Sequence, residues 1–145
     1  MIIRPVAAED RAAWDALYDG YAQFYGVPQT PEMRATVWGW LNDPNHEVSG
    51  FIAENDGVLV GFAHCRAFAR PLAAASGLFL DDLFVSEASR GTGAAAALID
   101  VVKSKAATEG HSIVRWITAA DNGRARGLYD KVAQATEWVT YDITI

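Results

Sequence analysis

Residues 83–95 read LFVSEASRGTGAA, and this stretch predicts an apolar strand that passes through a short glycine-bearing turn into a helix. Glycine has no Cβ, so the backbone N–H groups around Gly91 and Gly93 can approach an anion closely, and the positive end of the helix favours negative charge there. Arg90 adds a side chain suited to phosphate. The junction therefore predicts an anion-binding turn. The alternative is an ordinary strand-to-helix turn.

This turn differs from the two common nucleotide-binding motifs. It lacks the Lys-Ser/Thr ending of a P-loop. It also lacks the third glycine and the acid-ended second strand of a dinucleotide fingerprint. Neither of those nucleotide-binding classes is predicted.

The chain before the junction predicts a strand, two helices and a hairpin. Residues 2–6 suit a short edge strand, because Pro5 cannot donate to a central ladder. Thr30 and Pro31 mark the start of the second helix, and residues 55–57 (Asn-Asp-Gly) mark a hairpin between two apolar runs. The first helix is indicated by side chains that recur every three or four positions, namely Trp14, Leu17, Tyr18, Tyr21 and Tyr25.

The chain after the junction alternates helices and strands: a helix over 91–108, a strand over 113–118, a helix that Asp121 or Asn122 caps, and a final strand over 136–145. The order β-α-α-β-β-β-α-β-α-β describes a mixed sheet with helices on its faces. We therefore expect one α/β (α+β) layered domain formed by residues 1–145.

Composition excludes several classes of protein and site. There are 12 Lys and Arg against 18 Asp and Glu, a formal net charge of −6, and no basic stripe that would hold nucleic acid. Cys65 is the only cysteine, so neither an internal disulfide nor a cysteine-rich zinc site is expected, and the three histidines lack metal-ligand spacing. No apolar run approaches the roughly 20 residues of a membrane span, and the apolar run at residues 1–3 is too short for a signal peptide. We expect a cytoplasmic protein with no nucleic-acid, membrane or metal partner.

Two adjacent carboxylates stand in an otherwise apolar strand, at Asp81 and Asp82. Neighbouring side chains of a regular strand point to opposite faces, so only one of them faces a substrate unless a bulge intervenes. An unpaired buried carboxylate is costly, and pairing with Arg or Lys is the alternative to a catalytic role. His64 is interpreted as a hydrogen-bonded structural histidine rather than a base, and Cys65 as a small buried residue rather than a nucleophile.

Three separated segments resemble the GNAT superfamily of acetyl-CoA-dependent N-acetyltransferases. Residues 90–95 (RGTGAA) match its signature Arg/Gln-x-x-Gly-x-Gly/Ala, residues 81–85 (DDLFV) resemble its acid-bearing fourth strand, and residues 122–129 (NGRARGLY) resemble its Asn-x-x-Ala-x-x-x-Tyr helix. The resemblance covers nearly all 145 residues in the right order. It implies a GNAT-like mixed, mostly antiparallel central sheet with about four helices on its faces.

The resemblance also implies a site for acetyl-CoA as cosubstrate, with no metal. In the family, the fourth strand binds the pantetheine like an added strand, a bulge splays the neighbouring strand away, and the loop amides hold the pyrophosphate. The implied cofactor-binding residues are Leu83, Phe84, Val85, Arg90, Gly91, Thr92, Gly93, Ala94, Ala95 and Asn122.

Catalytic and substrate-binding roles follow from the same resemblance. Tyr129 is implied to protonate the leaving sulfur, and its alternative is a tyrosine of the core. By likeness to diamine N-acetyltransferases, Asp81 is implied to be the base acting through water, and Asp82 the acid that binds a substrate cation. Tyr21 and Tyr25 lie on the first of two helices that wall the acceptor site in the family, and either is implied to contact the amine; the alternative for each is an aromatic of the core.

The expected function is direct acetyl transfer to the primary amine of a small molecule such as a di- or polyamine. Three alternatives stay open. One is a histone-like enzyme that acetylates protein lysines or N-termini. The second is a catalytically silent acyl-CoA-binding module, and the third is an α/β scaffold without an acyl-CoA site.

The end of the chain departs from the family pattern. Residues 133–135 are Ala-Gln-Ala where the family often has Gly-Phe, and residues 136–145 allow one strand where two are usual. We expect a homodimer in which another subunit completes the edge of the sheet.

Overall fold

Five strands form one sheet, and their order across the sheet is their order in the sequence. They are β1 (Ile2–Pro5), β2 (Val48–Asn55), β3 (Val58–Arg70), β4 (Ala75–Val85) and β5 (Ile113–Arg115). All neighbours are antiparallel except β4 and β5, which are parallel and are joined by a crossover helix. This computed structural model, which covers residues 1–145, thus confirms the mixed, mostly antiparallel sheet.

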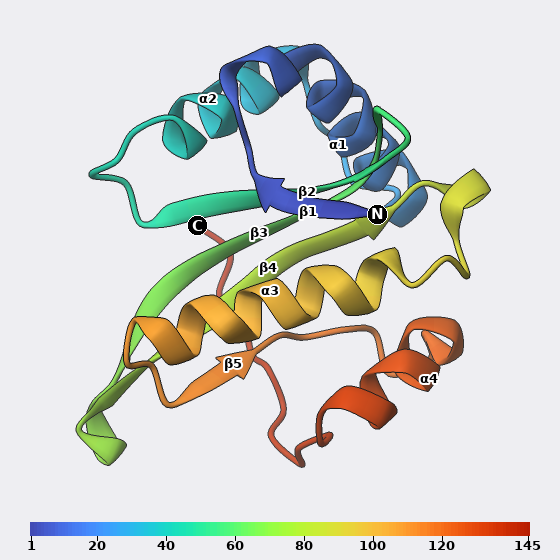
Figure 1. The fold of residues 1–145 in the computed structure, drawn as a ribbon. Coiled ribbons are helices and arrows are strands. Elements are labelled where there is room, and N and C mark those ends of the chain that lie inside the picture. The colour runs from blue at the N-terminus through green and yellow to red at the C-terminus, as the bar shows by residue number, and fades with distance from the viewer.

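Four helices cover the two faces of the sheet (Figure 1). They are α1 (Arg11–Tyr25), α2 (Pro31–Leu41), α3 (Ala94–Thr108) and α4 (Gly123–Val132), with short 3-10 turns at Ala8–Asp10, Pro71–Ala73 and Glu87–Ser89. Helices α1 and α2 lie on one face, and α3 lies on the other with α4 beside it near β5.

Local capping follows the sequence closely. The Thr30 hydroxyl accepts the backbone N–H of Met33 at 3.2 Å, and Asn122 Oδ1 accepts that of Ala125 at 3.4 Å, so both predicted caps are confirmed. Asp56 and Gly57 have φ angles of 50° and 80°, the left-handed pair that a two-residue hairpin turn needs.

Each face of the sheet has its own core. On the α1–α2 face, Trp14, Ile52 and Phe62 are fully buried. The larger core lies under α3, and α4 adds Leu128 and Tyr129 to its margin. Its buried members are Ala53, Val60, Ala63, Cys65, Leu78, Leu80, Ala94, Leu98, Ile99, Val102 and Ala106.

The predicted final strand over residues 136–145 is wrong for the single chain. The segment after α4 has no regular secondary structure, and β5 ends at Arg115 rather than residue 118. A strand needs a neighbour to pair its backbone N–H and C=O groups, and this segment has none. Five large apolar side chains are therefore at least 74% exposed: Trp138, Val139, Tyr141, Ile143 and Ile145.

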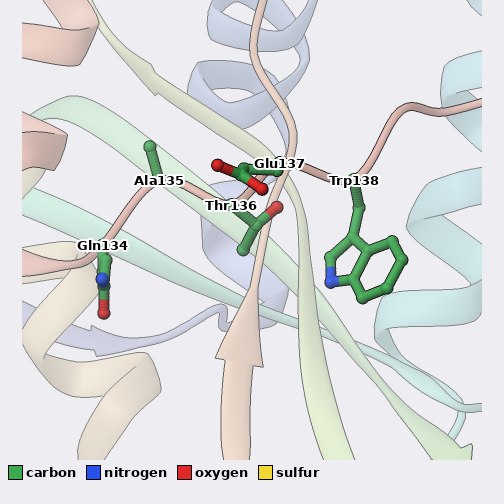
Figure 2. Close-up of a pocket in the computed structure, with 5 residues that line it drawn as sticks. All are labelled: Gln134, Ala135, Thr136, Glu137 and Trp138. Carbon is green, nitrogen blue, oxygen red and sulfur yellow. The ribbon is translucent and has the colours of Figure 1, made fainter.

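A hollow of about 570 Å³ next to this segment is lined only by its own residues Gln134–Trp138. Figure 2 shows these five side chains spreading in different directions from the extended backbone. The hollow therefore belongs to the loose segment and brings no distant residues together. Separately, none of the helices combines the length and the apolar character needed to span a membrane.

Candidate functional site

Strands β4 and β5 separate after a short stretch of pairing, and a cavity opens between them. They pair only where Gly77–Phe79 lie beside Ile113–Arg115. Beyond that point the cavity has a volume of about 400 Å³. Its lining comes from α1, β4, the segment after β5 and α4, and consists of Tyr21, Tyr25, Leu80, Asp81, Leu83, Trp116, Ile117, Thr118, Ala119 and Tyr129. Five of the predicted site residues therefore meet here: Tyr21, Tyr25, Asp81, Leu83 and Tyr129.

A β-bulge in β4 turns both adjacent carboxylates toward the same face of the sheet. His64 lies opposite Asp82 and Cys65 opposite Leu80, which leaves Asp81 as an extra residue. Asp81 pairs with Arg66, and Asp82 pairs with His64. Because residues 64 and 66 of β3 share a face, the two carboxylates do as well. The bulge that would let both carboxylates share a face is therefore present.

Asp81 is the carboxylate that reaches the cavity. Arg66 Nε lies 3.0 Å from its Oδ2, and about a third of the side chain is exposed. Burial raises the pKa of Asp81 above its ordinary value, and Arg66 partly opposes that rise. A carboxylate with a raised pKa is better matched to accepting a proton near neutral pH.

Asp82 lies against α1 and is held by a chain of hydrogen bonds. The Tyr18 hydroxyl donates to Asp82 Oδ2 at 3.0 Å, and His64 Nδ1 lies 2.8 Å from the same oxygen. Trp14 Nε1 donates to His64 Nε2 at 2.9 Å, so Nδ1 carries the proton of the neutral imidazole and donates to Asp82. His64 is 1% exposed, which confirms its interpretation as a structural histidine. Asp82 itself is not part of the cavity lining.

Tyr129 projects from α4 into the cavity and packs edge-on against Trp116, with ring centroids 5.4 Å apart. Burial raises the pKa of its phenol, so the group stays protonated and can donate. Tyr21 and Tyr25 line the cavity from α1, with ring centroids 5.0 Å apart. Burial, together with the nearby Asp82, also raises the pKa of Tyr21.

The turn before α3 presents free backbone donors. Gly91 and Gly93 have φ angles of 80° and 87°, and an added Cβ at either would meet nothing within 4 Å. No hydrogen bond within the chain uses the N–H groups of residues 91–95. These N–H groups and the start of the 15-residue α3 suit a phosphate group.

Arg90 is held over the ring of Phe24, with Cζ 4.9 Å from the centroid. This contact ties the loop before α3 to the end of α1. Phe24 is 57% exposed and lies at the edge of the apolar face of α1, so its helical spacing indicated a core aromatic and gave no sign of its contact with Arg90.

The other predicted cofactor residues lie along β4 and at the start of α4. Leu83–Val85 pair with β3 on one side only, and β5 does not extend to them on the other. Asn122 caps α4, and its Nδ2 donates to the Thr118 hydroxyl at 3.3 Å. The Asn122 side chain thus contacts its own helix and is not part of the cavity lining.

Cys65 is fully buried in the core beside Ser49. Burial raises the pKa of its thiol, which disfavours the thiolate. This confirms the interpretation of Cys65 as a small core residue. No three His, Cys, Asp or Glu side chains are grouped so that they could hold a metal ion.

Known proteins are similar to this chain in sequence and in fold. The Acetyltransferase (GNAT) family matches residues 14–133. The D-amino-acid N-acetyltransferase HPA3 of Saccharomyces cerevisiae is 31% identical over 143 residues, which are 97% of this chain and 89% of the yeast protein.

Two solved structures show the same fold. Ribosomal-protein-alanine N-acetyltransferase from Brucella melitensis biovar Abortus 2308 is 27% identical with a TM-score of 0.82, and all of both chains is covered. AAC(6')-Iy in complex with the bisubstrate analogue CoA-S-monomethyl-acetylneamine is 22% identical with a TM-score of 0.82, and 99% of this chain and 97% of that one are covered. With the family match spanning most of the sequence, this chain belongs to the acetyltransferase (GNAT) family.

Proposed function

We propose that this acetyl-CoA-dependent N-acetyltransferase transfers the acetyl group directly to the primary amine of a small molecule. One observation carries the proposal: a single cavity holds a carboxylate of raised pKa, Asp81, and a protonated phenol, Tyr129. The two acids at 81 and 82 favour a cationic acceptor, such as the di- or polyamine expected from the sequence. The similarity to the yeast D-amino-acid N-acetyltransferase supports an amino acid instead.

The residues present fit acetyl-CoA. The free N–H groups of residues 91–95 and the guanidinium of Arg90 would hold its pyrophosphate, and the open edge of Leu83–Val85 would receive the pantetheine. We propose that Asn122 also contacts acetyl-CoA. When bound, acetyl-CoA supplies an activated acyl thioester with a thiolate leaving group.

The side chains of the cavity then divide the proton transfers between them. An alkylamine is protonated at neutral pH, and Asp81 accepts its proton, directly or through water. Asp82 adds negative charge beside Asp81 and so favours binding of the protonated amine before the amine loses its proton. Tyr129 donates its phenolic proton to the departing sulfur, and Tyr21 and Tyr25 face the amine with their rings.

We further propose that residues 1–145 form one domain, that the protein is cytoplasmic, and that it is a homodimer. The homodimer is supported by the segment 136–145, which combines strand-forming residues with exposed apolar side chains. Added to the open edge of β5 in a second copy, this segment would pair its backbone and bury those side chains.

The function is tested by titrating acetyl-CoA calorimetrically and then measuring thiol release with small amines and basic peptides. We expect acetyl-CoA to bind and thiol to be released with small amines. Binding without release on any acceptor would favour the silent acyl-CoA-binding module. Release with basic peptides alone would favour a protein acetyltransferase, and no binding at all would contradict the proposal.

Replacing Tyr129 by Phe removes the proton donor and keeps the ring. We expect kcat to fall by roughly 100-fold or more, because a general acid contributes about 10²–10⁴ to a rate, while the Kd for acetyl-CoA stays nearly unchanged. Thiol release and calorimetry measure the two effects. Tyr141→Phe is the control: Tyr141 lies outside the cavity and is 91% exposed in the single chain, and removing its hydroxyl should leave both quantities unchanged. Normal turnover in Tyr129→Phe would make Tyr129 a residue of the core.

Replacing Asp81 by Asn removes the proposed base. In the parent enzyme, kcat/KM should fall as the pH drops through the pKa of Asp81, which burial raises, because only the ionised carboxylate accepts a proton. In Asp81→Asn we expect a much lower rate without that acidic limb, measured as kcat/KM against pH. Asp100→Asn, an exposed position on α3, should keep the parent profile. An acidic limb that survives in Asp81→Asn would point to another base.

The dimer is tested by light scattering coupled to size exclusion. We expect the full chain to have about twice its mass of 15.7 kDa, and a chain truncated after Ala135 to be monomeric, because the proposed added strand is missing. A mass of 15.7 kDa for the full chain at working concentration would exclude the dimer. A truncated chain that remains dimeric would place the interface elsewhere.

A further inference from the structure

Two arginines lie on one face of the sheet with Phe79 between them, near the cavity that Asp81 lines. Arg66 of β3 is opposite Phe79 of β4, and Phe79 is opposite Arg115 of β5, so the three side chains share one face. Arg66 Cζ lies 4.9 Å from the ring centroid of Phe79, and Arg115 Cζ lies 5.3 Å from that of Phe68. The two phenylalanine rings pack edge to face at 6.1 Å. We call Arg66, Phe68, Phe79 and Arg115 the arginine ledge.

The ledge has more positive charge than its surroundings neutralise. Arg66 contacts Asp81 through Nε alone, and its two Nη atoms have no partner within the chain. Arg115 forms no ion pair and no side-chain hydrogen bond. In a chain with a net charge of −6, two guanidinium groups oriented by aromatic rings and left with free N–H donors are suited to an external carboxylate.

The ledge adjoins the proposed base directly. Arg66 Nε and Asp81 Oδ2 are 3.0 Å apart, and Asp81 lines the cavity that also holds Tyr129. A molecule that carries an amine and a carboxylate on one carbon presents a positive and a negative charge at a spacing comparable to that between Arg66 and Asp81. It can therefore exchange with the internal pair, with its amine at Asp81 and its carboxylate at Arg66.

We propose that the acceptor is an amino acid whose carboxylate binds the arginine ledge through Arg66 and Arg115. This inference rests on the proposed amine acetylation and names its substrate class. It also disfavours a di- or polyamine, because the second ammonium group would meet the two guanidinium groups at like charge.

The test compares three acceptors that differ only at the carboxylate: an amino acid such as phenylalanine in its D and L forms, its amide, and the decarboxylated amine. We expect kcat/KM of the parent enzyme to be about 10- to 100-fold higher for at least one form of the amino acid, because a hydrogen bond to a charged group contributes about 1.5–3 kcal/mol. Arg115→Met should raise KM for the amino acid by about tenfold and leave KM for the amide and the shape of the pH profile unchanged.

A binding measurement isolates the carboxylate from the reacting amine. The N-acetyl amino acid has no titratable amine, so its affinity for the CoA-saturated enzyme reports the carboxylate contact. We expect Arg66→Met and Arg115→Met each to weaken this affinity about tenfold, and Arg124→Met, exposed on α4, to leave it unchanged.

Several results would overturn this inference. One is equal kcat/KM for the amino acid and its amide in the parent enzyme, and another is an equal loss on both acceptors in Arg115→Met. The third is unchanged binding of the N-acetyl amino acid in both arginine variants. Thiol release with the amine and amide but not with the amino acid would overturn this inference and leave amine acetylation standing. No release with any of these acceptors would overturn this inference, and no release with the wider panel of small amines either would overturn the proposed function as well.

Discussion

The extra residue that β4 carries at Asp81 is the constraint on which the site depends. Without it, Asp81 and Asp82 would point to opposite faces, and one of them would enter the core under α3. With it, Asp81 reaches the cavity while Asp82 turns toward α1. The bulge also brings Leu80 and Leu83 to the same face, so apolar packing under α3 continues past the two acids. One inserted residue thus reconciles an acidic site with an apolar strand.

The bulge is supported from the side of α1. Asp82 accepts hydrogen bonds from Tyr18 and His64, and Trp14 in turn donates to His64. Each of the four side chains in this hydrogen-bonded series has a partner. The carboxylate of Asp82 is therefore stabilised by hydrogen bonds, although little of it is exposed to water and no Lys or Arg pairs with it. His64 Nε2 accepts from Trp14, so Nδ1 is the ring nitrogen that faces Asp82. His64 therefore positions Asp82, and Asp81 is left as the carboxylate that can exchange a proton with the cavity.

Features that depend on a few consecutive residues were predictable, and features that depend on pairing were not. The hairpin at Asp56 and Gly57 and the caps at Thr30 and Asn122 are local choices of backbone angle and hydrogen bond, and all were predicted. The bulge depends on the register between β3 and β4, which periodicity alone does not contain. The contacts of Arg66 with Asp81 and of Arg90 with Phe24 join distant segments. The strand over 136–145 was predicted from residue type, but a strand also requires a partner.

The ion pair between Arg66 and Asp81 links recognition of the acceptor to the strength of the base. In the free enzyme, Arg66 lowers the pKa of Asp81 and works against the rise that burial causes. If the acceptor's carboxylate binds the arginine ledge as proposed, it pairs with the guanidinium of Arg66, which then interacts less strongly with Asp81. The opposing effect of Arg66 on the pKa of Asp81 then weakens, and the acceptor's own ammonium becomes the cationic neighbour of Asp81 until its proton is transferred. An acceptor without a carboxylate leaves the pair intact and meets a weaker base, so selection acts on the proton transfer as well as on binding.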